Sequence, residues 1–284
     1  MGLDLDDRQR AMLREMNVEV WWPRPAAPVE VLPAQVLKRQ ASAPASASAS
    51  APARVERAPA VQAIRQMQAV SSSTDASALS WPDLQQAVAN CQACQLCEGR
   101  QHTVFGVGQA PPDTQSPPQV DWLIVGEAPG ENEDRTGEPF VGQAGQLLDN
   151  MLKAMGLSRR ENVYIVNVIK CRPPGNRNPE VAEIAQCEPY LRRQIELLQP
   201  KVIVAMGRFA VNSLLQASVP DAPKIALGKL RGQVHGYASA GRSIPVIATY
   251  HPAYLLRNLP EKAKAWADLC LATQVMAGNA PRQP

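Results

Sequence analysis

The sequence predicts an α/β protein, a three-layer α/β/α sandwich built around a central four-stranded parallel sheet. Four short apolar runs are separated by stretches with helical periodicity. The runs do not alternate between apolar and polar residues, so helices should cover both faces of each strand. The four runs are residues 122–125, 163–168, 202–206 and 246–249.

Helix signals fill the intervals between these runs. Ser80 precedes Trp81-Pro82-Asp83 and should cap the first helix of the folded domain. Asn178 should cap a later helix that has Pro179 in its first turn. The later helices are expected at residues 143–155, 179–198, 208–215 and 261–276.

Composition divides the 284 residues into four parts. We expect a short helical island at residues 1–23, a disordered linker at 24–80, a folded domain at 81–278 and a flexible tail at 279–284. The linker contains ASAPASASASAPA, which cannot bury enough apolar surface to offset the entropy lost on folding.

Charge and hydropathy exclude some classes of protein. The net charge of +3 permits nucleic-acid binding but does not argue for it. No apolar run reaches the roughly 18 residues of a membrane span, and the N-terminus lacks an apolar signal core. We therefore expect a cytoplasmic monomer with no membrane segment.

The cysteine spacing favours an iron–sulfur protein. Cys91 and Cys94 form a C-x-x-C, and Cys171 and Cys187 follow far along the chain. Cytosolic cysteines are rarely disulfides, so metal or catalytic roles come first. Because no separate C-x-x-C pair lies farther along the chain and there is no histidine partner, the pattern suits a cluster held between distant segments better than zinc.

Several polar or small residues follow the predicted strands, where ligands of parallel sheets bind. Gly126, Ala128 and Gly130 in the run GEAPG would let a ligand approach the backbone, although the run alone equally suits a structural loop. Asn167, on an otherwise apolar strand, needs hydrogen-bond partners. The rule places on one rim residues 126–130, Asn167, Gly207 and His251.

Three rim residues have side chains suited to chemistry. Glu127 can orient or deprotonate a water, or can simply be a solvated loop carboxylate. Phe140 can stack on a planar ligand or belong to the core. His251, fixed by the following proline, can stabilise developing negative charge.

The segment after His251 suits a DNA contact. Leu255 and Leu256 are consecutive and cannot both face one helix stripe, so one of them is expected to project outward as an apolar wedge. Arg257 beside them suits a phosphate.

Together these motifs resemble the family 4 uracil-DNA glycosylases, the bacterial and archaeal iron–sulfur class. The resemblance covers about residues 84–275. It rests on CQAC, VFGVG, LIVGEAPGENEDRTGEPFVGQAGQLL, YIVNVIKCRPPGNRNP, the spaced Cys187 and YHPAYLLRN. It implies hydrolysis of the N-glycosidic bond of uracil after base flipping, which initiates base excision repair. It also implies a location in a bacterial cytoplasm.

The resemblance also implies residue roles. Phe140 would stack on uracil, Asn167 would read its polar edge, and His251 would stabilise the departing uracil anion. Leu255 or Leu256 would fill the vacated stack, and Arg257 would bind phosphate. Ala128 stands where better-known relatives have an aspartate, so Glu127 stays open as water activator or as a residue that orders the pocket.

A [4Fe–4S] cluster is implied as well, on Cys91, Cys94, Cys171 and Cys187. We expect it to be structural rather than redox-active, and to order Lys170, Arg172 and Arg177 near DNA. Cys97 is placed outside the cluster, since Cys171 and Cys187 occupy the family's other two positions. Cys270 is expected to be a buried thiol. A related branch with a covalent histidine in a KRRIH insertion is disfavoured, because CRPPGNRNP follows Lys170.

Other readings stay open beside this one. A nucleotide- or phosphate-handling enzyme is disfavoured, since GxxxxGK[ST] and GxGxxG are missing. A non-catalytic iron–sulfur DNA-binding or polymerase-accessory module is the main alternative. The stretch MLREMNVEVWWPRP is similar to the N-terminal segment of the psi subunit of the bacterial clamp loader. Residues 1–23 are therefore either a frayed helix or a peptide that binds a replisome or repair protein.

Overall fold

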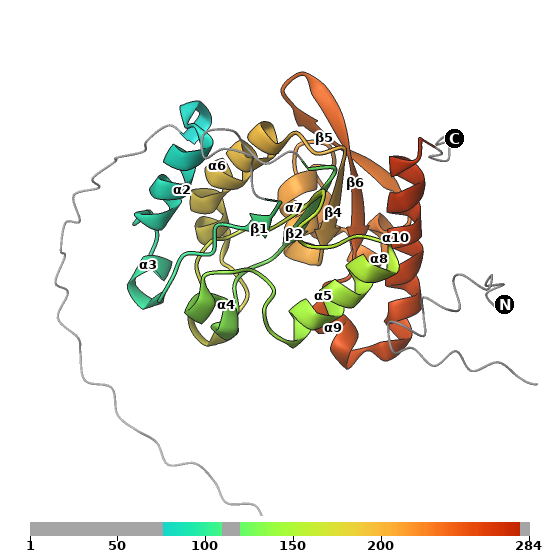
Figure 1. The fold of residues 1–284 in the computed structure, drawn as a ribbon, viewed down its shortest axis with the longest axis horizontal. Coiled ribbons are helices and arrows are strands. Elements are labelled where there is room, and N and C mark those ends of the chain that lie inside the picture. The colour runs from blue at the N-terminus through green and yellow to red at the C-terminus, as the bar shows by residue number, and fades with distance from the viewer. Residues whose placement is uncertain (1–75, 110–119, 279–284) are drawn as a thin grey trace, which may run out of the picture. The chain divides into compact units, whose positions relative to one another are not determined.

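The computed structural model describes residues 76–109 and 120–278. The predicted island at 1–23, the tail at 279–284 and most of the predicted linker lie outside the described residues. Six strands form one sheet in the order β1-β3-β2-β4-β6-β5 (Figure 1). They are β1 (Val107–Gly108), β2 (Trp122–Gly126), β3 (Val163–Asn167), β4 (Val202–Met206), β5 (Val234–Ser239) and β6 (Arg242–Thr249).

The four predicted strands form the parallel centre of this sheet, as β3-β2-β4-β6. The α/β sandwich and its four parallel central strands are confirmed, although the whole sheet has six strands rather than four. The two additional strands, β1 and β5, pair antiparallel at the edges. Neither reads as an apolar run, because β1 has two residues and β5 (VHGYAS) is half exposed along most of its length.

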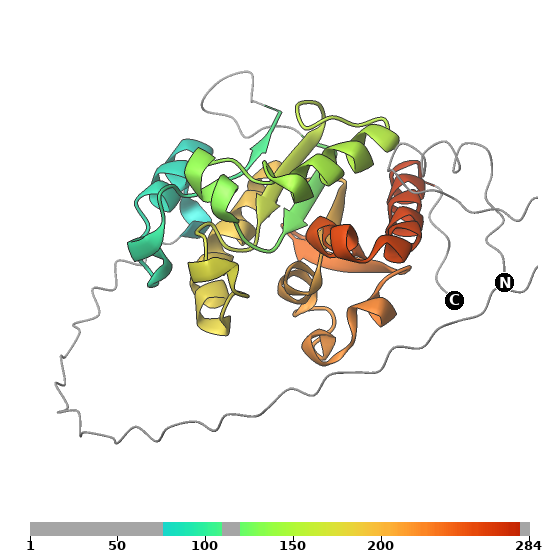
Figure 2. The same ribbon diagram turned by 90° about the horizontal axis from the view of Figure 1, so that it is seen from below.

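Helices cover both faces of the sheet (Figure 2). The longer ones are α2 (Trp81–Ala89), α5 (Gln143–Ala154), α6 (Val181–Leu198), α7 (Arg208–Leu215) and α10 (Lys262–Met276). The short ones are α3 (Leu96–Gly99), α4 (Glu131–Thr136), α8 (Leu227–Leu230) and α9 (Pro252–Arg257). The 3-10 turns are η1 (Ala76–Ala78), η2 (Pro174–Asn176), η3 (Ala222–Lys224) and η4 (Leu259–Glu261).

Alternate residues of the strands belong to two separate cores. In β2, Leu123 and Val125 pack in the core shared with α2, α6 and α7, whereas Trp122 and Ile124 pack in the core shared with α5, α9 and α10. All five residues of β2 are buried, which explains why the run is continuously apolar. Truncation of a buried residue such as Leu148 to alanine would destabilise the fold by about 2–5 kcal/mol.

Most of the predicted helix ends are confirmed, and one is wrong. The Ser80 hydroxyl caps α2 by accepting from the Asp83 N–H at 3.4 Å. The predicted cap at Asn178 is replaced by Glu180, whose N–H donates to the Glu183 carboxylate at 2.8 Å. Arg177 pairs with that carboxylate at 2.6 Å, so charge and capping together start α6 at Val181.

The folded domain begins before residue 81. Ala76 in η1 is buried, and the Leu79 carbonyl accepts from Arg193 Nε of α6 at 2.8 Å. The last residues of the predicted linker therefore pack against the domain. Among the described residues, every helix is too short or too polar to cross a membrane.

Candidate functional site

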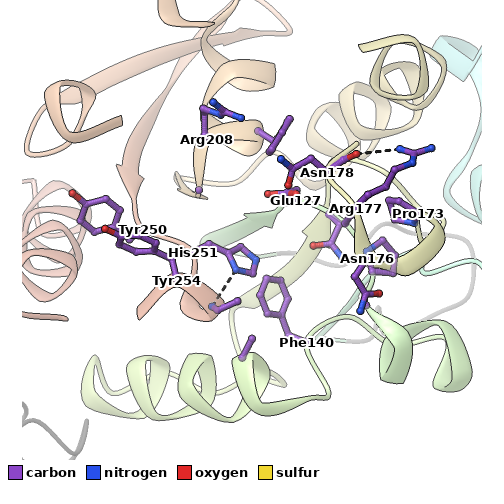
Figure 3. A pocket seen from close by; sticks show the side chains of 18 of the residues that line it. Glu127, Phe140, Pro173, Asn176, Arg177, Asn178, Arg208, Tyr250, His251 and Tyr254 are labelled. Atoms are coloured by element: carbon purple, nitrogen blue, oxygen red, sulfur yellow. Dashed lines mark hydrogen bonds between the residues drawn. The ribbon is translucent and has the colours of Figure 1, made fainter. Parts of the chain in front are cut away.

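A cavity of about 780 Å³ opens at the carboxyl ends of the parallel strands (Figure 3). It is lined by the loops after β2, β3, β4 and β6, as the rule for parallel sheets requires. Seven of the predicted site residues line it. They are Glu127, Ala128, Gly130, Phe140, Asn167, His251 and Arg257.

Asn167, the last residue of β3, presents an unpartnered oxygen at this cavity. The side chain is 1% exposed, and its Oδ1 has no hydrogen-bond partner among the residues that the structure describes. Gly126 pairs with Asn167 across β2 and β3, and a Cβ at position 126 would overlap both Oδ1 and the Phe140 ring. Glycine at 126 is therefore required for the present positions of Asn167 and Phe140. A buried amide oxygen without a partner is costly, which points to a ligand that donates a hydrogen bond to it.

Phe140 is buried, and its backbone lies in the left-handed region with φ of 56°. A non-glycine residue is held in this region only where its surroundings fix it. Its ring stacks on His251, with centroids 5.4 Å apart and planes inclined by 29°. The two rings thus come from separate parts of the chain to form one aromatic wall.

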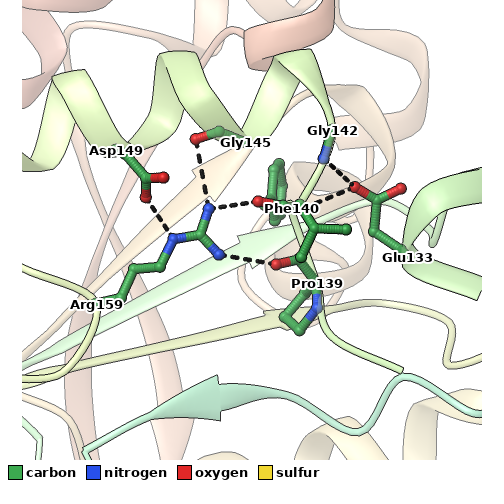
Figure 4. A network of polar contacts seen from close by, with 8 residues as sticks. Glu133, Pro139, Phe140, Gly142, Gly145, Asp149 and Arg159 are labelled. Atoms are coloured by element: carbon green, nitrogen blue, oxygen red, sulfur yellow. Dashed lines mark hydrogen bonds and ion pairs between the residues drawn. The ribbon is translucent and has the colours of Figure 1, made fainter. Parts of the chain in front are cut away.

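Two charged side chains hold the Phe140 loop, residues 139–142, from opposite sides (Figure 4). Arg159 donates to the carbonyls of Pro139 (2.9 Å) and Phe140, and its Nε pairs with Asp149. The Glu133 carboxylate accepts from the N–H groups of residues 141 and 142 at 2.9 and 3.0 Å, and from that of residue 130 at 3.1 Å. These charge-assisted bonds explain how the strained conformation of Phe140 is maintained.

His251 is the N-cap of α9. Its Nδ1 accepts from the Ala253 N–H at 3.2 Å, so the proton of the neutral ring resides on Nε2. Burial lowers the pKa of His251 to about 4, and the charge of Arg257 lowers it further while that of Glu133 opposes this. The ring is therefore neutral at physiological pH and has one N–H to donate.

Gly207 lets the chain after β4 pass close to His251. Its φ is 87°, and a Cβ built at this position would lie 3.1 Å from the His251 Cβ. The next residue, Arg208, lines the cavity and acts electrostatically on Glu127. Partial burial raises the pKa of Glu127, and the Arg208 charge offsets this in part. Glu127 is thus a carboxylate with more than usual affinity for a proton.

The residues expected to contact DNA lie in different environments. Leu255 is 0% exposed in the core, whereas Leu256 is 38% exposed, so only Leu256 is available as a wedge. Arg172 lies outside the cavity lining and pairs with Glu131 at 3.2 Å. Lys170, expected near DNA, is buried at 1% exposure, and that prediction was wrong.

A second, small cavity is lined by cysteines from two parts of the chain, the segment before the sheet and the region after β3. Five cysteines line it, together with Arg100 and Lys170. Arg100 Nη1 donates to Cys171 Sγ at 3.2 Å. The cysteines are Cys91, Cys94, Cys97, Cys171 and Cys187.

This thiol set suits a cluster better than one ion. Across residues 76–109 and 120–278, no three His, Cys, Asp or Glu side chains converge to hold a single metal ion. A four-iron cluster takes one thiolate at each iron, which spreads the sulfurs farther apart. Cys97, predicted to lie outside the cluster, borders the same cavity, whereas Cys270 lies partly buried on α10 against the other core.

Several lining residues were missed by sequence reasoning. Arg208 lies two residues after β4 and Tyr250 directly follows β6, so the strand-end rule that found His251 applies to them too. Glu133 lies in an acidic run that reads as loop charge, and only its three backbone bonds reveal its role. Asn176 and Tyr254 have no sequence signal that distinguishes them from other loop residues, whereas Arg177 and Asn178 were singled out for other roles, near DNA and as a helix cap.

Comparisons with known proteins point in one direction. The profile of the uracil DNA glycosylase superfamily matches residues 112–270. The type-4 uracil-DNA glycosylase of Archaeoglobus fulgidus is 42% identical over 177 residues, covering 62% of this chain and 83% of that protein. That of Thermotoga maritima is 44% identical over 171 residues, covering 60% and 80%. The type-5 uracil-DNA glycosylase of Pyrobaculum aerophilum is less similar, at 32% over 150 residues, covering 48% and 62%.

Proposed function

This chain belongs to the type-4 uracil-DNA glycosylases of the uracil-DNA glycosylase superfamily, and we propose that the cavity at the strand ends is where uracil binds. The enzyme hydrolyses the N-glycosidic bond of uracil in DNA, the first step of base excision repair. A base inside a duplex is out of reach, so the nucleotide must first be flipped from the stack.

The unpartnered Oδ1 of Asn167 is the observation that carries the assignment of the site. Uracil has an N3–H that donates to this oxygen and an O4 that accepts from the amide nitrogen. Cytosine has a lone pair at N3 and a donor at position 4, so both contacts would be mismatched. A buried mismatch of this kind leaves polar groups unpaired, which is how a small site rejects a similar base strongly.

Phe140 and His251 act on the same uracil ring. Phe140 supplies the stacking face, which the Arg159 and Glu133 bonds keep in place. As the bond from N1 to the sugar breaks, negative charge develops on uracil O2. The neutral His251 donates its Nε2–H toward that oxygen, an effect typically worth about 3 kcal/mol.

Glu127 activates the water that attacks the sugar. Its raised pKa makes it a better base than an exposed carboxylate, and it stands in the cavity wall at the end of β2. A bond that breaks dissociatively needs only a weakly activated nucleophile, so one carboxylate suffices.

Cys91, Cys94, Cys171 and Cys187 would hold a [4Fe–4S] cluster, which when bound cross-links the segment before the sheet to the loop after β3 and to α6. Support comes from the shared cavity and from the Arg100 donor to Cys171. Cys97 is a neighbour in this proposal, not a ligand.

DNA lies across the cavity mouth. Leu256 fills the space left by the flipped nucleotide, and Arg257 binds a phosphate. Arg172 lies outside the cavity lining, and its Nε donates to the side-chain oxygen of Asn176, a lining residue, at 2.7 Å. A replisome or repair partner for residues 1–23, a monomeric state and a bacterial cytoplasmic location stay predictions.

The function is tested by incubating the purified protein, with its iron content measured, with a DNA oligonucleotide containing one uracil. Alkali then cleaves any abasic site. We expect a single strand break at the uracil and none in the thymine control. No break from iron-loaded protein would favour the alternative of a non-catalytic DNA-binding module.

A further inference from the structure

The chemistry proposed above leaves one buried cation unused. Lys170 lies three residues after the end of β3. It is 1% exposed, so its side chain is shielded from water. Burial of an ammonium costs several kcal/mol unless hydrogen bonds and opposite charge offset it. Its Nζ donates to the backbone carbonyl of Asn167 at 2.8 Å.

The same lysine borders the cysteine cavity. It lines that cavity, and its backbone N–H donates to the sulfur of Cys187. Lys170 therefore contacts both the cysteine cavity and the backbone of Asn167.

The backbone around Lys170 is tied to the loop that carries the pocket. The N–H of Val168 donates to Gly126 O at 3.0 Å, and that of Ile169 donates to Glu127 O at 3.2 Å. The Lys170 carbonyl accepts from Val104 at 2.8 Å. Residues 167–170 thus connect the uracil pocket to the cysteine cavity. The side chain of Lys170 folds back and bonds the carbonyl of Asn167, the first residue of this turn.

We propose that Lys170 is a positioning residue that links the cysteine cavity to uracil recognition: its Nζ, held beside that cavity, donates to the Asn167 carbonyl and thereby fixes the direction of the Asn167 amide. This inference rests on the proposed function. It also gives the cysteine site a second role besides cross-linking, because a cluster held there would place negative charge near the buried Lys170 side chain.

The link follows from the geometry of β3. Asn167 is the last residue of β3, and the N–H groups of Val168 and Ile169 after it hold the chain on the side of β2. A displacement of about 1 Å at a positioned group can lower a rate about 100-fold. The bond from Lys170 adds a restraint on the Asn167 carbonyl itself, from the side of the cysteine cavity.

The test is a double-mutant cycle on iron-loaded protein with Lys170→Met and Asn167→Ala. Lys201→Met is the matched control, because Lys201 lies at the amino end of β4 and is 67% exposed. Each variant is measured for iron content, visible absorbance, affinity for abasic DNA, affinity for free uracil and single-turnover excision. The wild type is measured first, and its failure to excise uracil would count against the proposed function and not against the role of Lys170.

We expect Lys170→Met to keep its iron and its affinity for abasic DNA while uracil binding and excision fall about 10- to 100-fold. In the Asn167→Ala background the same change should cost less than about threefold, because its effect passes through Asn167. Equal losses in both backgrounds, or a Lys170→Met protein that matches Lys201→Met, would overturn the inference. Should Lys170→Met lose its iron, Lys170→Arg is carried through the same cycle and judged by the same non-additivity.

Discussion

Gly126 and Asn167 lie opposite each other at the ends of β2 and β3, and the unpartnered side-chain oxygen of Asn167 occupies the space where a side chain at 126 would begin. The Phe140 ring shares this space. Because residue 126 has no methyl group, the Asn167 amide and the Phe140 ring can lie close together in the cavity wall.

Gly126→Ala should abolish most of the activity while leaving the fold intact. The added methyl group displaces Asn167 and Phe140, so single-turnover excision should fall about 100-fold or more. The melting temperature should change little, since the displaced groups border a cavity. Gly99→Ala is the control, because a Cβ there meets nothing within 4 Å. Excision by Gly126→Ala within about threefold of the wild type would contradict this role.

The pH profile of single-turnover excision should show one acid limb, and it should belong to Glu127. The carboxylate form is needed, and its pKa is raised by burial, so the rate falls as pH drops through a value above 4.5. His251 stays neutral down to about pH 4, so no change is expected near pH 6.5.

Glu127→Gln should remove this limb and lower the rate about 100-fold without changing affinity for abasic DNA. Near-wild-type rates in Glu127→Gln would show instead that this residue only orders the pocket. A rate that rises as pH falls below 6.5 would mean that a protonated histidine is the active form.

Leu255 and Leu256 should differ sharply despite being neighbours. Leu256→Ala removes an exposed wedge, so excision from duplex DNA should fall several-fold while excision from single strands is unchanged. Leu255→Ala removes a core residue and should lower the free energy of unfolding by about 2–5 kcal/mol. Equal effects of both variants on duplex excision at constant stability would contradict the assignment.

Cys171→Ala should lower the stability of the fold and the affinity for DNA before it affects the excision chemistry itself. The cysteine is buried beside Arg100, and the segment it anchors leads into the loop with Arg172 and Arg177. Iron content, melting temperature and DNA affinity should all fall, whereas Cys97→Ser and Cys270→Ser should retain iron. A stable Cys171→Ala protein that binds DNA and lacks only chemistry would refute the structural role of the cluster.

The sequence predicted the parts of the fold that have a local signal. Continuous apolar runs identified β2, β3, β4 and β6, and the strand-end rule brought Asn167 and His251 to one rim. The edge strand β5 was missed because it is half exposed along most of its length and mixes polar and apolar residues.

Contacts across long sequence separations could not be read in this way. Arg159 holds the Phe140 carbonyl 19 residues earlier, and nothing in its neighbourhood marks that role. Lys170 was expected near DNA because it belongs to a basic loop, yet the tight turn after β3 buries it between the two cavities. The choice between Leu255 and Leu256 likewise depended on how α9 packs against α5.

The most direct test of the uracil site is single-turnover excision of uracil by Asn167→Ala, compared with its affinity for abasic DNA. The account predicts a loss of at least about 100-fold in excision, with abasic-DNA affinity and iron content unchanged. An Asn167→Ala protein that excises uracil within about threefold of the wild-type rate would contradict it.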